Sequence, residues 1–129
     1  MNPEVSPWVV KAEEDFAVAR RELRVRRNPA YDSICFHAEQ CVEKYLKARL
    51  VAAGLAFPKT HDLVLLVDLL AKAEPLWAAF RPDMSILAGF AALFRYPGES
   101  ADRETAKDAV TRCRRFRKAA RLALGLSGR

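Results

Sequence analysis

Seven proline residues divide this chain, and their positions limit what it can fold into. Proline lacks a backbone N–H and clashes with the preceding turn, so it is tolerated in the first turn of a helix but not in its interior. Between the prolines, apolar residues recur every three or four positions, which is the spacing of one helix face. The prolines therefore mark the joints between helices: Pro3, Pro7, Pro29, Pro58, Pro75, Pro82 and Pro97.

The apolar spacing predicts where each helix lies. The expected helices cover residues 7–26, 29–53, 60–73, 84–94 and from 100 or 102 to about 125, with a short turn over 76–80. A polar side chain just before a helix can accept a hydrogen bond from a free backbone N–H of its first turn. The residues expected in this capping role are Ser6, Asn28, Thr60, Asp83, and either Ser100 or Asp102.

The composition agrees with helices and not with strands. Alanine occurs 22 times and leucine 15 times, whereas isoleucine occurs twice and threonine three times. Hydrophobic residues make up 51% of the 129 positions, which excludes an intrinsically disordered chain. The expected fold is all-α: an up-and-down antiparallel bundle of four main helices plus a short extra helix or turn, in a single domain over residues 1–129.

Several classes of protein are excluded or disfavoured. The longest stretch without a charged residue, 84–94, is about half of what a membrane span needs, so we expect no membrane segment. The first residues lack a secretory pattern, and the three cysteines have no paired spacing, so we expect a cytoplasmic protein. His37 and Cys41 are four residues apart, but no second ligand pair accompanies them, and we expect no metal.

The positive charge is concentrated near the end of the chain. The net charge is +6, and residues 101–129 alone carry nine Lys or Arg against three Asp or Glu. Such a patch can attract a polyanion such as RNA, or it can be an ordinary solvated helix face. The candidate polyanion-binding residues are Arg112, Arg114, Arg115 and Lys118.

Three separated motifs carry a family resemblance. Residues 31–54 read YDSICFHAEQCVEKYLKARLVAAG, and FPKTHDL and FRYPG follow in order. This combination resembles the HEPN family of small prokaryotic helical proteins, with Glu39 and Cys41 in place of a more usual Gln and Ala. The resemblance implies a four- or five-helix bundle, commonly a homodimer, often encoded beside a minimal nucleotidyltransferase with which it forms a toxin–antitoxin type of pair.

The resemblance also implies a motif that catalytic members should carry, and this chain lacks that motif. Many HEPN proteins are metal-independent ribonucleases whose activity is associated with an Arg followed four to six residues later by a His, near the start of the last helix. The histidines here are His37 and His61, both before Arg95, and Arg27 precedes His37 by ten residues. The sequence therefore favours a non-catalytic member.

Polar residues along the segment 29–53 form the candidate ligand site. On a helical projection His37, Gln40 and Lys44 fall within about sixty degrees of one another. Imidazole and ammonium donors can bind phosphate, or they can satisfy polar groups of the bundle itself. The candidate ligand-binding residues are His37, Gln40, Lys44, His61, Arg95 and Tyr96.

One further surface is left open by the sequence. Phe36, Leu50 and Phe57 lie away from the main apolar stripe, which indicates either a self-association surface or a bundle that covers both sides of this helix.

Three functions remain open at this stage. The first is a nucleotide-binding protein or nucleotidyltransferase partner of a toxin–antitoxin type module, with no cofactor beyond a nucleotide ligand. The alternative is a divergent metal-independent ribonuclease, in which His37 or His61 supplies acid–base chemistry and the basic helix holds RNA. The third is a dimeric scaffold with neither ligand nor activity.

Overall fold

The helix α2 (Tyr31–Ala52) runs through the middle of the molecule, and the other four α-helices all pack against it. The computed structural model describes all 129 residues. Apolar residues on several sides of α2 are wholly buried, which is why one helix can serve as the centre of the bundle. These residues include Ile34, Ala38, Cys41, Val42, Tyr45, Leu46, Ala48 and Leu50.

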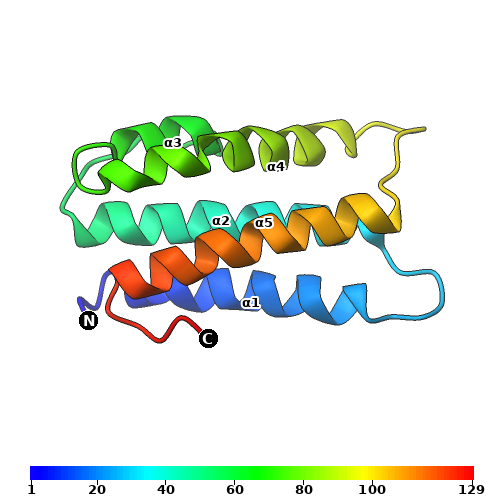
Figure 1. Cartoon of the computed structure of the whole chain (residues 1–129), viewed down its shortest axis with the longest axis horizontal. Helices are drawn as coiled ribbons and strands as arrows, with labels where there is room; N and C mark the ends of the chain where they lie inside the picture. The colour runs from blue at the N-terminus through cyan, green and yellow to red at the C-terminus, as the bar shows by residue number, and fades with distance from the viewer.

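The four long helices alternate in direction along the chain, whereas the short third helix runs in the same direction as α2 (Figure 1). The helix α1 (Ser6–Leu23) and the helix α5 (Arg103–Ala123) cover one side of α2. A layer of α3 (Leu63–Leu69), the 3₁₀ helix η1 (Pro75–Phe80) and α4 (Arg81–Leu93) covers another side. The predicted all-α, up-and-down arrangement is confirmed, with η1 as the short extra helix.

Two aspartates cap helices, as their side-chain chemistry favours. The Asp102 carboxylate accepts a hydrogen bond of 2.8 Å from the Thr105 N–H at the start of α5, as one of the two expected positions predicted. The Asp62 carboxylate accepts one of 3.1 Å from the Leu65 N–H at the start of α3. Both carboxylates also suit the positive end of a helix dipole.

The other predicted caps are wrong. Ser6 and Asp83 already lie inside the first turns of α1 and α4, whose cap positions are Val5 and Phe80. A proline in each first turn presets the helical backbone without a side-chain cap. The other two overturned predictions are Asn28 and Thr60, which Ala30 and Asp62 replace at the cap positions of α2 and α3.

Two helices are shorter than the apolar spacing predicted. The helix α1 ends at Leu23 instead of residue 26, because the three residues after Leu23 are exposed and have no core to pack against. The helix α3 covers only seven residues. After it the chain turns so that the Glu74 carboxylate accepts a hydrogen bond of 2.9 Å from Arg49 Nε. Because α1 ends at Leu23, the loop between α1 and α2 includes the three arginines of the segment RVRRN.

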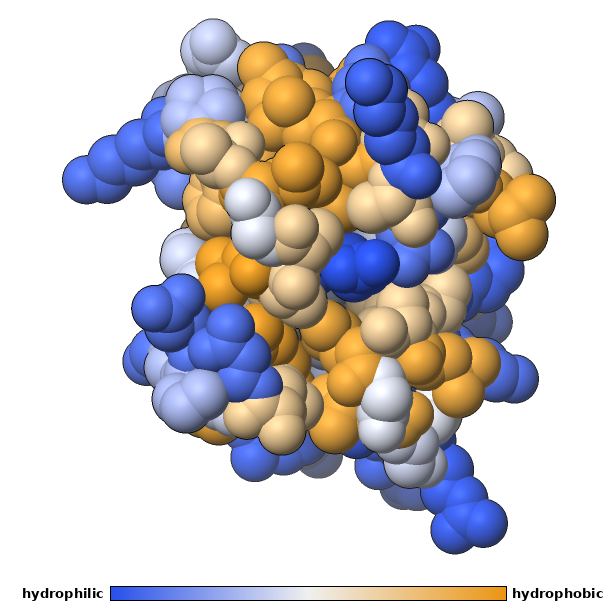
Figure 2. All heavy atoms as spheres, turned by 90° about the vertical axis from the view of Figure 1, so that its left-hand side faces the viewer, coloured by the Kyte–Doolittle hydropathy of each residue, from blue (hydrophilic) through white to orange (hydrophobic).

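Both chain termini lie at one end of the bundle, and the loops at residues 24–30 and 94–102 lie at the other (Figure 1). Figure 2 looks at the end with the termini, where hydrophobic side chains gather over the middle of the face and hydrophilic ones lie mainly around its rim. The buried side chains form one core cluster of 28 residues to which every helix contributes. No helix combines the length and the apolar character that crossing a membrane requires.

Candidate functional site

His37 and Lys44 are bonded to a single carboxylate of α1. His37 Nδ1 lies 2.7 Å from Asp15 Oδ1, and Lys44 Nζ donates to Asp15 Oδ2. The two α2 residues reach the same partner because residues seven apart lie two helical turns apart on one face. Only 10% of the Asp15 side chain is exposed. The contact therefore joins α1 to α2, and a phosphate at this position would compete with Asp15 for both donors.

Gln40 and His61 meet at a second carboxylate, that of Glu43. His61 Nδ1 lies 2.9 Å from Glu43 Oε1, and Gln40 Nε2 donates to the same oxygen over 3.4 Å. Lys47 Nζ donates to the other oxygen over 3.1 Å. Glu43 is buried, whereas the His61 side chain is 77% exposed. The loop before α3 thus returns to α2 and presents an imidazole to solvent.

Glu39 lies one turn before Glu43 and is also buried. Gln40 Nε2 donates to its carboxylate over 2.9 Å. Burial disfavours the charged form and raises the pKa of Glu39 to about 7, although the Gln40 hydrogen bond and the charges of His61 and Arg95 act in the opposite direction. Glu39 and Glu43 thus place two carboxyl groups of α2 beside Gln40, and Asp15 of α1 supplies a third carboxyl group to His37 and Lys44.

Arg95 and Tyr96 lie on the exposed segment after α4. The Tyr96 side chain is among the most exposed apolar groups, at 67%. Arg95 forms no ion pair with another side chain, and its charge is close enough to Glu39 to lower that group's pKa. Arg95 is therefore an exposed guanidinium that forms no ion pair and acts on Glu39 through its charge.

The four predicted polyanion-binding residues of α5 divide between two sides of the helix. Arg112 donates to Asp83 of α4 over 2.6 Å, and Arg115 donates to the same carboxylate over 3.4 Å. Arg114 faces α1, with its guanidinium carbon 5.9 Å from the centre of the Phe16 ring. Lys118 is exposed and forms no ion pair. The four residues do not form one continuous basic face.

A larger network that the sequence analysis missed joins α1, α2 and α5. Arg117 donates two hydrogen bonds of 2.7 Å to the Glu13 carboxylate and lies over the Phe16 ring at 4.4 Å. The Tyr45 hydroxyl also donates to Glu13, and Arg121 donates to the Tyr45 oxygen over 3.1 Å. Burial raises the pKa of Glu13, but the hydrogen bonds from Arg117 and Tyr45 outweigh it, so the net pKa is lowered. This network holds three helices together.

The proposed self-association surface is only partly exposed. Phe36 is 41% exposed and available. Leu50 is wholly buried, so for this residue the second of the two alternatives holds: the bundle covers that side of α2. Phe57 is partly buried and packs edge-on against Trp8, with 6.3 Å between the ring centres.

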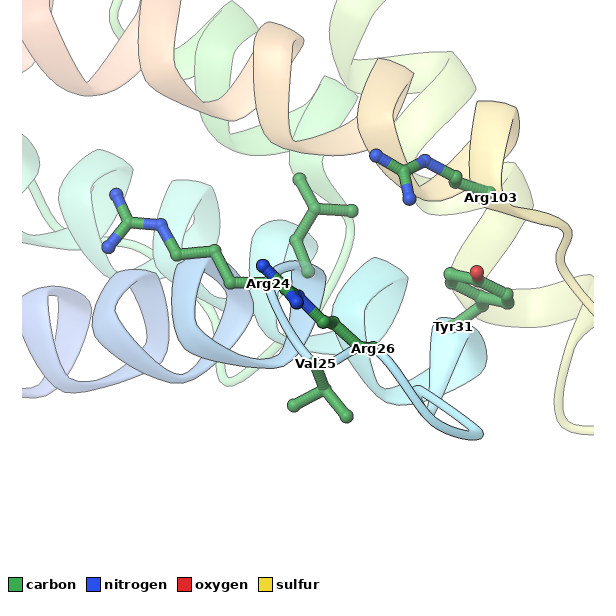
Figure 3. A pocket seen from close by; sticks show the side chains of 6 residues that line it. Arg24, Val25, Arg26, Tyr31 and Arg103 are labelled. Carbon is green, nitrogen blue, oxygen red and sulfur yellow. The ribbon is translucent and has the colours of Figure 1, made fainter.

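The sequence analysis also missed a pocket at the other end of the bundle (Figure 3). A cavity of about 490 Å³ lies between the end of α1, the loop after it and the first turns of α2 and α5. Its lining residues are Leu23, Arg24, Val25, Arg26, Tyr31 and Arg103. A cluster of cations inside the loop 24–27 was the signal that could have indicated it.

The comparison with protein families decides what kind of bundle this is. The family model of the HEPN domain matches residues 5–123. The chain belongs to the HEPN domain family. The resemblance carried by the α2 pattern, the THDL turn and the RYP element is thereby confirmed. The matched region includes all the carboxylate-bonded residues described above and the pocket at the end of α1.

One curated relative is similar to part of this HEPN domain. A protein of Methanocaldococcus jannaschii with the name "Putative toxin MJ1304" is 42% identical over 50 residues. The aligned segment is 39% of this chain and 31% of the relative, so the similarity spans about a third of the relative's length. No solved structure matches the chain.

Proposed function

We propose that this HEPN protein is one component of a toxin–antitoxin type pair and that it acts by binding, not by cutting RNA. The observation that supports this most directly is the state of its two histidines. Each imidazole is bonded through Nδ1 to a carboxylate of the same chain, Asp15 for His37 and Glu43 for His61. Neither follows an arginine at the four-to-six-residue spacing of the family's ribonuclease motif.

The proposed partner is a minimal nucleotidyltransferase, and the proposed ligand is a nucleotide. The family resemblance supports the partner, and the name of the archaeal relative supports the toxin–antitoxin context. The excess of positive charge supports a phosphate-bearing ligand, since long-range fields concentrate anions near a protein of net charge +6. A homodimer is part of the same proposal, with exposed Phe36 as one available apolar contact.

The partner is tested by co-expression with the nucleotidyltransferase encoded beside this chain, where such a reading frame exists. We expect the two chains to copurify in a fixed ratio, and sedimentation of this chain alone to give a dimer. Separate purification of the two chains at every salt concentration would contradict the partner. A monomer would contradict the dimer without affecting the rest.

The absence of cleavage is tested directly. Purified protein is incubated with end-labelled RNA at low salt, and we expect the RNA to stay intact. The nucleotide is tested by calorimetric titration with ATP, for which we expect heat of binding. No heat with any nucleotide would contradict the ligand and leave the partner to its own experiment.

A divergent ribonuclease is the second candidate, and one observation favours it. His61 is exposed, and its Nδ1 bond to the buried Glu43 leaves Nε2 free toward solvent, as a general acid or base would require. If RNA is cleaved, His61→Ala should abolish the cleavage, while His37→Ala should reduce it less. Cleavage that survives both substitutions would point to a contaminating nuclease.

A further inference from the structure

The arginines of the pocket at the end of α1 have no carboxylate partner. Arg24, Arg26 and Arg103 form no ion pair and no side-chain hydrogen bond, unlike Arg112 and Arg117 of α5. Bringing three guanidinium groups around one cavity costs electrostatic free energy when no anion is present. An arrangement that is unfavourable when empty becomes favourable when an anion enters.

Three nearby carboxylates are directed to the backbone and form no ion pair with these arginines. Glu22 accepts from the Ala30 N–H over 2.8 Å, and Asp32 accepts from the Ala101 N–H over 2.7 Å. Asp102 caps α5. These bonds fix the loops that form the pocket walls and turn the acidic oxygens toward the backbone. The carboxylates thus hold the loops around the pocket in place, and three arginines line it.

The lining residues come from separate segments that the fold brings to one end of the bundle (Figure 3). Arg24 and Arg26 follow α1, Tyr31 opens α2, and Arg103 opens α5. Figure 3 shows the Arg26 and Arg103 side chains on two sides of the hollow and the Tyr31 ring below Arg103.

A second hollow continues from the first across Tyr31. It measures about 350 Å³ and is lined by Pro29, Ala30, Tyr31, Asp32, Ser100 and Ala101. This lining contains no cation and one carboxylate, that of Asp32, so it suits a group that carries no negative charge and can donate hydrogen bonds. Cavities of about 300 to 1,000 Å³ accommodate small organic ligands. The two hollows, which share Tyr31, therefore offer an arginine-lined half and a half without cations.

We propose that the arginine-lined pocket binds the phosphate groups of a nucleotide-sized ligand, whose uncharged part lies in the neighbouring hollow against Tyr31. Guanidinium groups bind phosphate through paired N–H donors, and the Tyr31 hydroxyl adds a further donor. This site differs from the α2 residues predicted from the sequence, whose donors are bonded to carboxylates. The inference rests on the proposed function only for the choice of a nucleotide as ligand.

The test measures binding to the full-length protein by calorimetry in low-salt buffer, with three probes. Pyrophosphate tests the arginine-lined pocket alone, ATP tests both hollows, and adenosine tests the neighbouring hollow alone. We expect ATP to bind more tightly than pyrophosphate, and adenosine to give no measurable heat. Affinity for ATP should fall as salt rises, because ions screen exposed charges.

Substitutions then locate the site. Arg26→Ala and Arg103→Ala should each weaken ATP binding about tenfold, because each removes charged hydrogen bonds to phosphate. Arg103→Lys should give an intermediate loss, since lysine keeps the charge but not the planar pair of donors. Arg81→Ala is the matched control: it removes an exposed guanidinium at α4, outside the pocket, and should leave ATP affinity unchanged. Thermal melting of each variant checks that the fold is intact.

The outcomes separate this inference from the proposed function. ATP binding that is unaffected by Arg26→Ala and Arg103→Ala, or equally weakened by Arg81→Ala, overturns the site while leaving a nucleotide ligand in place. Absence of binding by pyrophosphate and ATP overturns both the site and the ligand, whereas the partner is tested separately by copurification. A 5′-phosphorylated RNA pentamer that competes with ATP, while its 5′-hydroxyl form does not, would identify an RNA end as the source of the phosphate.

Discussion

The two ends of α5 use their arginines in opposite ways. Toward its carboxyl end, Arg117 and Arg121 reach the Glu13 and Tyr45 network, where each guanidinium joins neighbouring helices. At its amino end, Arg103 shares a pocket with Arg24 and Arg26 and has no acidic partner. A guanidinium with a carboxylate partner stabilises the fold, whereas one without such a partner is available to an external anion. Net charge alone does not distinguish the two.

The largest effect is expected at the paired end. Arg117→Ala removes both hydrogen bonds to Glu13 and the contact with the Phe16 ring, and it leaves Glu13 without its main partner. We expect the free energy of unfolding to fall by roughly 2–4 kcal/mol, somewhat below the cost of breaking a fully buried pair because Glu13 is about a third exposed. Urea denaturation measures this loss. A fall below about 0.5 kcal/mol would show that the network does not hold the helices together.

A second prediction extends the comparison to carboxyl groups. Glu39 is buried without a cation in contact, and its pKa rises from 4.5 to about 7 on folding. The folded state therefore binds more protons than the unfolded state between these values, so Glu39 contributes stability that is lost as pH rises from about 4.5 to 7. Glu39→Gln should remove this loss and raise stability at pH 8 by roughly 1–3 kcal/mol.

Glu13 provides the contrast in the same titration. Its pKa is lowered on folding because the hydrogen bonds from Arg117 and Tyr45 outweigh burial. Its contribution is present above its unfolded pKa and is lost as pH falls through the folded value. Denaturation curves of Glu39→Gln and of the unsubstituted protein, measured from pH 4 to pH 8, should therefore diverge toward high pH. Parallel curves would contradict the assignment to Glu39.

A third prediction compares two arginines of α5 that reach the same carboxylate. Arg112→Ala removes short contacts to Asp83 and Asp108 and should lower stability by about 1 kcal/mol. Arg115→Ala removes a single 3.4 Å contact from a side chain that is 58% exposed, and should change stability by less than about 0.5 kcal/mol. Thermal melting of both variants measures the difference. Equal losses would mean that the contact distance does not decide the effect.

The smallest effect on stability is expected at the unpaired end. Arg103→Ala should change the free energy of unfolding by less than about 0.5 kcal/mol, because the side chain is exposed and without an ion partner. The same variant should lose most of its ATP affinity. A large destabilisation would indicate that Arg103 has a structural role and would weaken the comparison between the two ends.

The elements of the fold could be predicted from the sequence because their causes are local. The apolar spacing indicated α2. The capping role of Asp102 could be predicted because its carboxylate directly precedes the first turn of α5. The first turns of α1 and α4 were harder, because a proline makes a side-chain cap unnecessary there. Residues 24–26, which the apolar spacing assigned to the first helix, lie instead in the loop after it.

The site depends on pairings between distant segments, which spacing does not reveal. Glu13 and Arg117 are 104 residues apart, and nothing near either residue indicates the other. Helical projection placed His37 and Lys44 together correctly, but not the Asp15 carboxylate that binds both. The arginine pocket requires three segments to meet at one end, so it emerges only with the assembled bundle.

The placement of both termini has a practical consequence for experiments. Both termini lie at one end of the bundle, and the segments that line the arginine pocket lie at the opposite end (Figure 1). The 21-residue helix α5 spans about 30 Å between them. An affinity tag, a fluorophore or a surface-coupling group attached at either terminus would therefore lie at the end of the bundle opposite the pocket. Immobilised protein should present the pocket to solution without obstruction.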